Sequence, residues 1–227
     1  MNHEEPLIRA KLKAPKAAAI AGIVFSVLLI ISLTMLLISI PANPREGGAW
    51  ISASKNTILL ALNLLPFSGI AFLWFIGVVR DRLGESEDRF FATVFLGSGL
   101  LFLAMLFTFA ALTGSIILLY LSQSNPLIAS GFYNFGYTTA REIMNSYAIK
   151  MAGVFMISTC TIFIRTQVIP RWMAWLGYAL AAIMILRISH IDRIGWVSLF
   201  FPLWVLLISI YLLIDNYRQK KLESSPA

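Results

Sequence analysis

The stretch REIMNSYAIKMAGVFMISTCTIFIRTQ, Arg141 to Gln167, decides how this chain folds. Most of it is apolar over a length that can cross a bilayer as one helix. It begins with a charged pair, Arg141 and Glu142, and it holds Lys150, the chain's only charge well inside an apolar segment. It also divides the chain into two halves with about three apolar segments each. This pattern predicts a membrane protein made of several spanning helices.

The composition indicates that lipid is the main solvent of the chain. Hydrophobic residues make up 59% and charged residues 13% of the sequence, and the mean hydropathy is +0.80. Soluble domains contain about 25% charged residues. The net charge of +7 could indicate nucleic acid, but the basic residues cluster at the ends of apolar segments, where they orient a chain in a membrane. We therefore predict the lipid bilayer as the chain's surroundings and no nucleic-acid partner.

The apolar segments predict an all-α fold, a bundle of six transmembrane helices joined by short loops. The expected spans are about 17–40, 57–79, 90–121, 142–164, 172–186 and 195–214. The transmembrane domain is thus expected over 17–215, between a basic tail at 1–16 and a polar, basic tail at 216–227.

The distribution of Lys and Arg predicts that both ends of the chain are cytoplasmic, because cytoplasmic segments carry the excess of these residues. In this orientation the cytoplasmic segments hold Arg9, Lys11, Lys13, Lys16, Arg80, Arg82, Arg89, Arg165, Arg171, Arg218, Lys220 and Lys221. The outer segments hold a smaller set, Arg45, Lys55, Arg141, Arg187 and Arg193.

The third apolar segment is unusually long and leads into a region with no charged residue. As one helix, 90–121 would measure about 48 Å, more than the ~30 Å of a hydrocarbon core. We expect a long helix that ends near Ser122, although a break near Thr113 to Ser115 would also relieve the excess length. The following SQSNPLIASGFYNFGYTTA, Ser122 to Ala140, is interpreted as an outer loop or a re-entrant segment.

Lys150 is the leading candidate for a functional residue. A charge at mid-membrane costs ~2.5 kcal/mol or more, so it should face the bundle or water and find a partner. At about 100° per residue, Ser146, Lys150 and Thr161 fall within about 60° on one helix face, and Glu142 lies about 80° from Lys150 on the outer turn. This polar stripe predicts a cationic group at the floor of an outward-open pocket. The alternative is a lysine that snorkels to the outer interface or pairs with Glu142.

The predicted ligand is a small anionic, amphipathic or lipid-like solute that is bound or transported through this pocket. Its expected contacts are Lys150, Glu142, Tyr147, Asn63, Tyr137 and Arg141. Asn63 belongs to this set because it stands close to Pro66, and an amide near a broken membrane helix often lines a cavity. A hydrogen bond between packed helices is the alternative for Asn63.

Polar residues near the outer ends of the spans form a second group that could converge. Its members are Tyr133, Asn134, Tyr137, Arg141, Glu142, Arg187, His190, Asp192 and Arg193. His190 and Asp192 resemble a fragment of a metal or acid–base site, but two residues do not make a ligand set. Ion pairing at the outer surface is the default interpretation of this group, and it stabilises little.

The sequence predicts no cofactor, no metal and no catalytic residue. Membrane hydrolases use paired Asp, His-rich or Ser–Lys arrangements, and no acidic residue stands inside an apolar segment here. The single cysteine, Cys160, lies in an apolar segment and is interpreted as a small buried hydrophobe. A membrane-embedded enzyme is therefore the least favoured function.

Small residues at four-residue spacing predict close contacts between helices. Examples are Thr93 with Gly97, Ala110 with Gly114 and Gly177 with Ala181. The alternative function is a non-catalytic interaction or assembly subunit of a membrane complex, in which the polar residues of the spans only hold helices together. Its partner would be a second copy of the chain or another membrane protein.

Two stretches carry a resemblance to known proteins. RDRLGESEDRFFATVFLGSGLLFLAMLF, Arg80 to Phe107, and IRTQVIPRWMAWLGYALAA, Ile164 to Ala182, resemble bacterial integral membrane proteins of unknown function. The resemblance implies a multi-pass protein of the cell inner (plasma) membrane. It implies no activity and supplies no functional residues.

Overall fold

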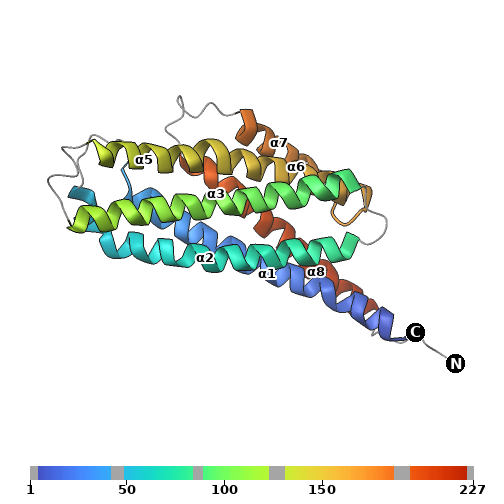
Figure 1. The fold of residues 1–227 in the computed structure, drawn as a ribbon. Coiled ribbons are helices and arrows are strands. Elements are labelled where there is room, and N and C mark those ends of the chain that lie inside the picture. Colours follow the sequence, from blue (N-terminus) through green and yellow to red (C-terminus); the bar gives the residue numbers. More distant parts are fainter. Residues whose placement is uncertain (1–4, 42–48, 84–88, 123–130, 187–194, 224–227) are drawn as a thin grey trace.

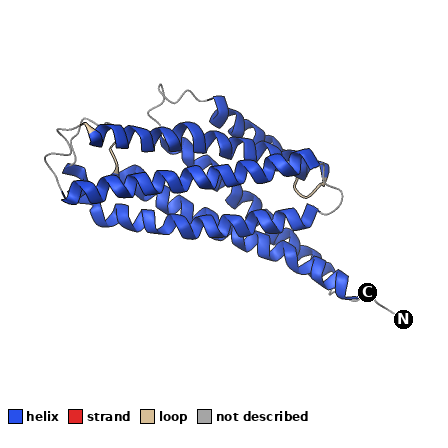
Figure 2. Cartoon of the chain, in the orientation of Figure 1, coloured by secondary structure: helices blue, strands red, loops and turns tan. Residues whose placement is uncertain are grey.

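A computed structural model describes residues 5–41, 49–83, 89–122, 131–186 and 195–223. Within these ranges the chain is almost entirely helical and contains no strand (Figure 2). The predicted all-α fold class is therefore confirmed.

The helices follow one another in this order along the chain. They are α1 (Glu5–Ser39), α2 (Ala49–Leu83), α3 (Arg89–Ser122), α5 (Phe132–Glu142), the π-helix η3 (Ile143–Ala148), α6 (Ile149–Arg165), α7 (Arg171–Leu186), the 3₁₀-helix η4 (Gly195–Leu199) and α8 (Phe200–Glu223). Four of the expected spans fall on α1, α2, α3 and α7. The span expected at 142–164 runs from the end of α5 through η3 and α6, and the one expected at 195–214 falls on η4 and α8.

The length and apolar composition of the helices identify this chain as a multi-pass membrane protein. Among the described residues, 5 helical stretches are long and apolar enough to cross a bilayer. They are Ala19–Ser39, Trp50–Arg80, Phe90–Ser122, Phe132–Arg165 and Gly195–Arg218. The helix α7 is apolar but has 16 residues, or about 24 Å, which is less than the ~30 Å hydrocarbon core.

The helices lie roughly side by side in one elongated bundle (Figure 1). Helix α1 packs along α2 and α8, α3 packs against α2 and α6, and α6 packs against α7. The beginning of α1 and the end of α8 lie at the same end of the bundle, which we call the terminal end. The opposite end, where α1 ends and where α2 and α5 begin, is called the distal end.

The region expected to be an outer loop or a re-entrant segment is helical from Phe132 onwards. It continues through η3 into α6, so that Phe132–Arg165 forms one long span. Tyr133, Tyr137 and Ala140 are buried and recur at helical spacing on one face. The burial of this face stabilises α5 as a helix. The helix α3 is continuous from Arg89 to Ser122, as expected, without a break near Thr113.

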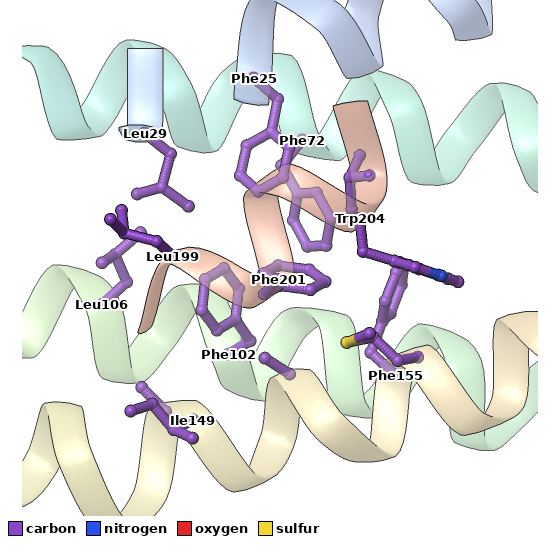
Figure 3. Close-up of a cluster of buried hydrophobic side chains, with 14 of the residues drawn as sticks. Phe25, Leu29, Phe72, Phe102, Leu106, Ile149, Phe155, Leu199, Phe201 and Trp204 are labelled. Atoms are coloured by element: carbon purple, nitrogen blue, oxygen red, sulfur yellow. The ribbon is translucent and has the colours of Figure 1, made fainter. Parts of the chain in front are cut away.

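Aromatic rings fill the middle of the bundle (Figure 3). The ring of Phe72 on α2 lies 4.5 Å from that of Phe25 on α1, 5.1 Å from that of Phe155 on α6 and 5.6 Å from that of Phe201 on α8, between centroids. Phe102 on α3 lies 4.8 Å from Phe201. Tilted and edge-on ring pairs are favourable contacts beyond the area that they bury. This aromatic core, Phe25, Phe72, Phe102, Phe155 and Phe201, joins five helices.

Candidate functional site

A cavity of about 320 Å³ lies at the distal end of the bundle. Its walls come from the ends of α1 and α3, from α5 and η3, and from η4. Most of the walls are apolar, and they include Leu33, Leu36, Leu37, Ile40, Pro41, Trp50, Phe109, Ile116, Ile117, Ala140, Met144 and Trp196. The polar residues that also line it are Thr113, Tyr137, Arg141, Asn145 and Ser198.

One helix face supplies three of these polar side chains. Tyr137, Arg141 and Asn145 stand four residues apart on α5 and η3, and residues at this spacing lie one above another on a helix. A phenol, a guanidinium and an amide therefore line the cavity in a row along this helix face. Arg141 is the only charged residue among the described residues that line it.

Two tyrosines hold α5 against the ends of α1 and α2. The Tyr137 hydroxyl donates a hydrogen bond to the carbonyl of Pro41, which follows α1. The indole N–H of Trp50 on α2 donates to the Tyr133 hydroxyl at 2.9 Å. The two tyrosine rings are stacked with their centroids 6.1 Å apart. These contacts fix the rim of the cavity, so Tyr137 has a structural role as well as a place in the wall.

Two of the polar groups that line the cavity have no protein partner in the described part of the chain. Neither the Thr113 hydroxyl nor the Asn145 amide makes a side-chain hydrogen bond to any described residue, whereas the Ser198 hydroxyl donates to the Gly195 carbonyl at 2.7 Å. A primary amide offers two donors and an acceptor. Asn145 can therefore bind a polar group that enters the cavity.

Lys150 does not line this cavity. It is half-buried on α6, just after the π-turn, where the Ile149 N–H donates to the Met144 carbonyl. A π-turn holds about one residue more than an α-turn, which rotates the following helix by roughly 100°. Lys150 therefore lies roughly 20° from Glu142 around the helix axis, and not the ~80° expected for an uninterrupted α-helix.

The polar side chains of the stripe expected to lead down to Lys150 form hydrogen bonds with other groups of the protein. The Ser146 hydroxyl donates to Glu142 Oε2 at 2.6 Å. The Thr161 hydroxyl lies 2.7 Å from the Tyr178 hydroxyl of α7 and also donates to the Ile157 carbonyl at 2.9 Å. Both ends of the stripe are thus engaged in internal hydrogen bonds.

The six residues predicted to bind ligand do not gather at one place. Tyr137 and Arg141 line the distal cavity, and Glu142 stands beside Arg141 with its carboxylate bonded to Ser146. Lys150, Tyr147 and Asn63 lie elsewhere. Tyr147 is 61% exposed. Asn63 is exposed on the outside of α2 and does not face the inside of the bundle.

Asn145 and Thr113 line the cavity although the sequence did not predict them as ligand-binding residues. Asn145 could have been found, because it stands one turn after Arg141 and two turns after Tyr137 in the same helix. Thr113 belongs to α3, and its place in the cavity depends on how α3 packs against α5. No pattern in the sequence reports that contact.

The second predicted group is described in part. Tyr133 is buried, Asn134 is exposed, and Tyr137, Arg141 and Glu142 lie as given above. Arg187, His190, Asp192 and Arg193 lie outside the described residues. Within the described ranges, no three His, Cys, Asp or Glu side chains come together as a metal site would require.

Comparison of the chain with protein-family models, curated proteins and solved structures found no match. The resemblance of Arg80 to Phe107 and of Ile164 to Ala182 to bacterial integral membrane proteins stays a prediction.

Proposed function

We propose that the protein binds a small amphipathic anion in the distal cavity. The observation that carries this function is one guanidinium, Arg141, in a wall whose other described residues are uncharged and mostly apolar. Cavities of about 300–1,000 Å³ with apolar walls and a few convergent polar groups are typical of small-molecule sites. At about 320 Å³ the cavity lies at the lower limit of this range, which favours a small ligand.

The chemistry of the wall favours an anionic headgroup with an apolar body. A guanidinium binds a carboxylate or a phosphate through two parallel hydrogen bonds, and this attraction is stronger where water is excluded. The Asn145 amide, one turn away, can donate to the same anion. The leucine and isoleucine side chains of α1 and α3 would cover the apolar body.

The aromatic core favours binding over passage. Phe25, Phe72 and Phe201 are at most 1% exposed. Along α1, α2 and α8 they stand between the residues that line the cavity and the terminal end. A solute that crossed the bundle along its axis would have to displace these rings. We therefore propose a binding protein and retain transport as a step that needs a second conformation.

The proposed orientation places the terminal end in the cytoplasm and the cavity at the outer side. The helix ends at the terminal end carry basic residues, among them Lys16 in α1, Arg80 in α2, Arg165 in α6 and Arg218 in α8. Lys55 stands near the beginning of α2 and Arg141 near the end of α5, toward the distal end. Cytoplasmic ends of membrane proteins carry the excess of positive charge. The inner membrane of a bacterium is proposed as the location, on the resemblance in the two stretches named above.

The test is a thermal-stability measurement on the protein in mild detergent. Wild type, Arg141→Met and Lys150→Met are compared in the presence of single-chain carboxylates, sulfonates and phosphates of increasing chain length. A ligand present at 100 times its Kd stabilises the native state by about 2.7 kcal/mol, which corresponds to a rise of several degrees in Tm. We expect this rise in wild type and Lys150→Met and its loss in Arg141→Met.

Lys150→Met is the matched control, because it also removes one cation from the same long helix but outside the cavity. A rise that survives in Arg141→Met and disappears in Lys150→Met would show that Lys150 is the anchor. If no anion raises Tm in wild type, while uncharged analogues of the same chain length do, the ligand is apolar. If neither class raises Tm, the protein is not a binding protein of this kind.

A further inference from the structure

The polar side chain of Asn63 stands on the outside of the bundle, near the middle of a membrane-spanning helix. Asn63 is exposed on α2, within the span Trp50–Arg80. The rise of an α-helix places it about 20 Å from Trp50 and about 25 Å from Arg80. Its amide makes no hydrogen bond to any described residue. In the bilayer this amide would face hydrocarbon, which supplies neither donors nor acceptors.

A second polar group on the same part of α2 lacks its usual partner. Pro66 lies inside α2 and has no N–H, so the Leu62 carbonyl one turn earlier loses its normal helical donor. Pro66 is exposed like Asn63. The exposed side of α2 therefore carries, at about the same depth, the Asn63 amide and a backbone carbonyl that lacks its helical N–H donor. An unsatisfied polar group in hydrocarbon costs several kcal/mol.

The residues around Asn63 form an outward face that nothing else in the described chain covers. Leu60, Phe67, Ile70 and Trp74 recur with Asn63 at spacings of three and four residues, so they share one side of α2. They are 53%, 62%, 53% and 68% exposed, respectively. We call these five residues the Asn63 face. Lipid tails can cover its apolar members, but they cannot satisfy the amide.

We infer that a second copy of this chain covers the Asn63 face, so that the two α2 helices pack against each other across a two-fold axis. Copies inserted with the same topology place Asn63 at the same depth. A two-fold axis normal to the membrane preserves depth, and it brings Asn63 of one copy opposite Asn63 of the other. An amide donates and accepts, so two identical amides satisfy one another. The Leu62 carbonyls offer further acceptors.

The self-complementarity of the amide favours a second copy over a different membrane protein. A different partner would need its own donor or acceptor at this depth, which nothing in the chain specifies. Polar side chains that bond across membrane helices contribute about 0.6–2 kcal/mol each. Two symmetric amide bonds therefore correspond to at least a roughly tenfold change in the dimerisation constant.

The test measures dimerisation of the full chain in lipid bilayers, by counting photobleaching steps as the protein is diluted in lipid. We expect a dimer for wild type and at least tenfold weaker dimerisation for Asn63→Leu, with partial recovery in Asn63→Gln. Thr108→Leu is the matched control. Thr108 is also an exposed polar residue of a spanning helix, but its hydroxyl already donates to the Ala104 carbonyl at 2.8 Å. Its removal should leave the dimer unchanged.

A second measurement locates the interface. In a Cys160→Ala background, Asn63→Cys should form a disulfide-linked dimer under mild oxidation, because a disulfide needs Cα atoms about 4.4–6.8 Å apart. Leu203→Cys, at an exposed position on α8, should not become disulfide-linked under the same conditions. A protein that is monomeric at every dilution would overturn the inference. So would a dimer that Asn63→Leu leaves unchanged, or a dimer linked through Leu203→Cys and not through Asn63→Cys.

Discussion

The centre of the bundle and its distal end use similar apolar residues and differ in how completely those residues fill space. At the centre, rings from five helices meet, and Phe25, Phe72, Phe155 and Phe201 are at most 1% exposed. At the distal end the helices leave a cavity of about 320 Å³. That end also contains both departures from α-helical geometry in the described chain, the π-turn η3 and the 3₁₀-helix η4.

This difference indicates that the centre of the bundle specifies the fold, whereas the distal end provides groups that can bind a ligand. Regular helices allow side chains to interlock along their whole length, as the aromatic core does. A π-turn or a 3₁₀-turn changes the rotation and rise of a helix and leaves mismatched surfaces beside it, and π-turns often occur at functional sites. Four substitutions test this division, from the largest expected effect on stability to the smallest.

Replacing a ring of the aromatic core should have the largest effect. Phe72→Ala removes a ring that touches Phe25, Phe155 and Phe201, and we expect it to lower the free energy of unfolding by about 3–5 kcal/mol. Reversible unfolding in mixed micelles measures the loss. Phe135→Ala is the control, because that ring is 69% exposed, and we expect a change within about 0.5 kcal/mol. Equal losses for the two variants would show that the centre does not dominate stability.

Adding a methyl group at Gly177, where α7 packs closely against α6 and α8, should have the next largest effect. A Cβ at Gly177 of α7 would collide with Cys160 Sγ of α6 and would lie 2.6 Å from Trp204 Nε1 of α8. We expect Gly177→Ala to lower the free energy of unfolding by about 1–3 kcal/mol, as overpacking does. Gly97→Ala is the control, because no atom of another helix in the described chain lies within 4 Å of its Cβ position. Cys160→Ala should recover part of the loss in the double variant, and a double variant no better than Gly177→Ala alone would argue against the collision.

Removing the hydroxyl that ties α5 to the end of α1 should have a moderate effect. Tyr137→Phe leaves the Pro41 carbonyl without this donor, and we expect a loss of about 0.5–1.5 kcal/mol. Hydrogen exchange of the amides of α5 should rise, while exchange around the aromatic core should not. An increase spread evenly over the bundle would show that the distal end does not open by itself.

Changing the cavity wall should have the smallest effect on stability. Asn145→Leu replaces an amide that makes no hydrogen bond to the described chain, so we expect the free energy of unfolding to change by less than about 0.5 kcal/mol. Binding of an anion that uses the amide should weaken by roughly 10- to 150-fold, since a hydrogen bond to a charged group contributes about 1.5–3 kcal/mol. Calorimetric titration with a ligand identified in the stability assay measures this. A large loss of stability without a change in affinity would assign Asn145 to the fold.

Hydropathy predicted the spanning helices well because length and apolar character are what the bilayer requires of them. The same property cannot tell the lipid-facing side of a helix from its buried side, because lipid tails and the interior of the bundle are equally apolar. Asn63 was expected to line a cavity because it stands close to Pro66, and it is exposed on the outside of α2. Gly177 lies at a tight contact as expected, whereas Gly97, with the same spacing signal, has open space beside it.

Two further differences arise from local geometry. Helix α5 was missed because its buried face is made of tyrosines among polar residues, which lowers hydropathy while leaving the helical periodicity intact. The angle between Glu142 and Lys150 was wrong because a helical wheel assumes an unbroken α-helix, and the π-turn adds a residue between them. Neither the π-turn nor its position is marked by a distinctive residue.

The unequal lengths of α7 and α3 also affect the thickness of the bilayer around the protein. Helix α7 has 16 residues and α3 has 34, so about 24 Å of helix stands on one side of the bundle and about 51 Å on another. Lipid beside α7 must thin or α7 must sink, whereas lipid beside α3 must thicken or α3 must tilt, each at a fraction of a kcal/mol per Å. The protein is therefore a source of bilayer deformation, and neighbouring lipids and proteins of matching thickness should gather on each side.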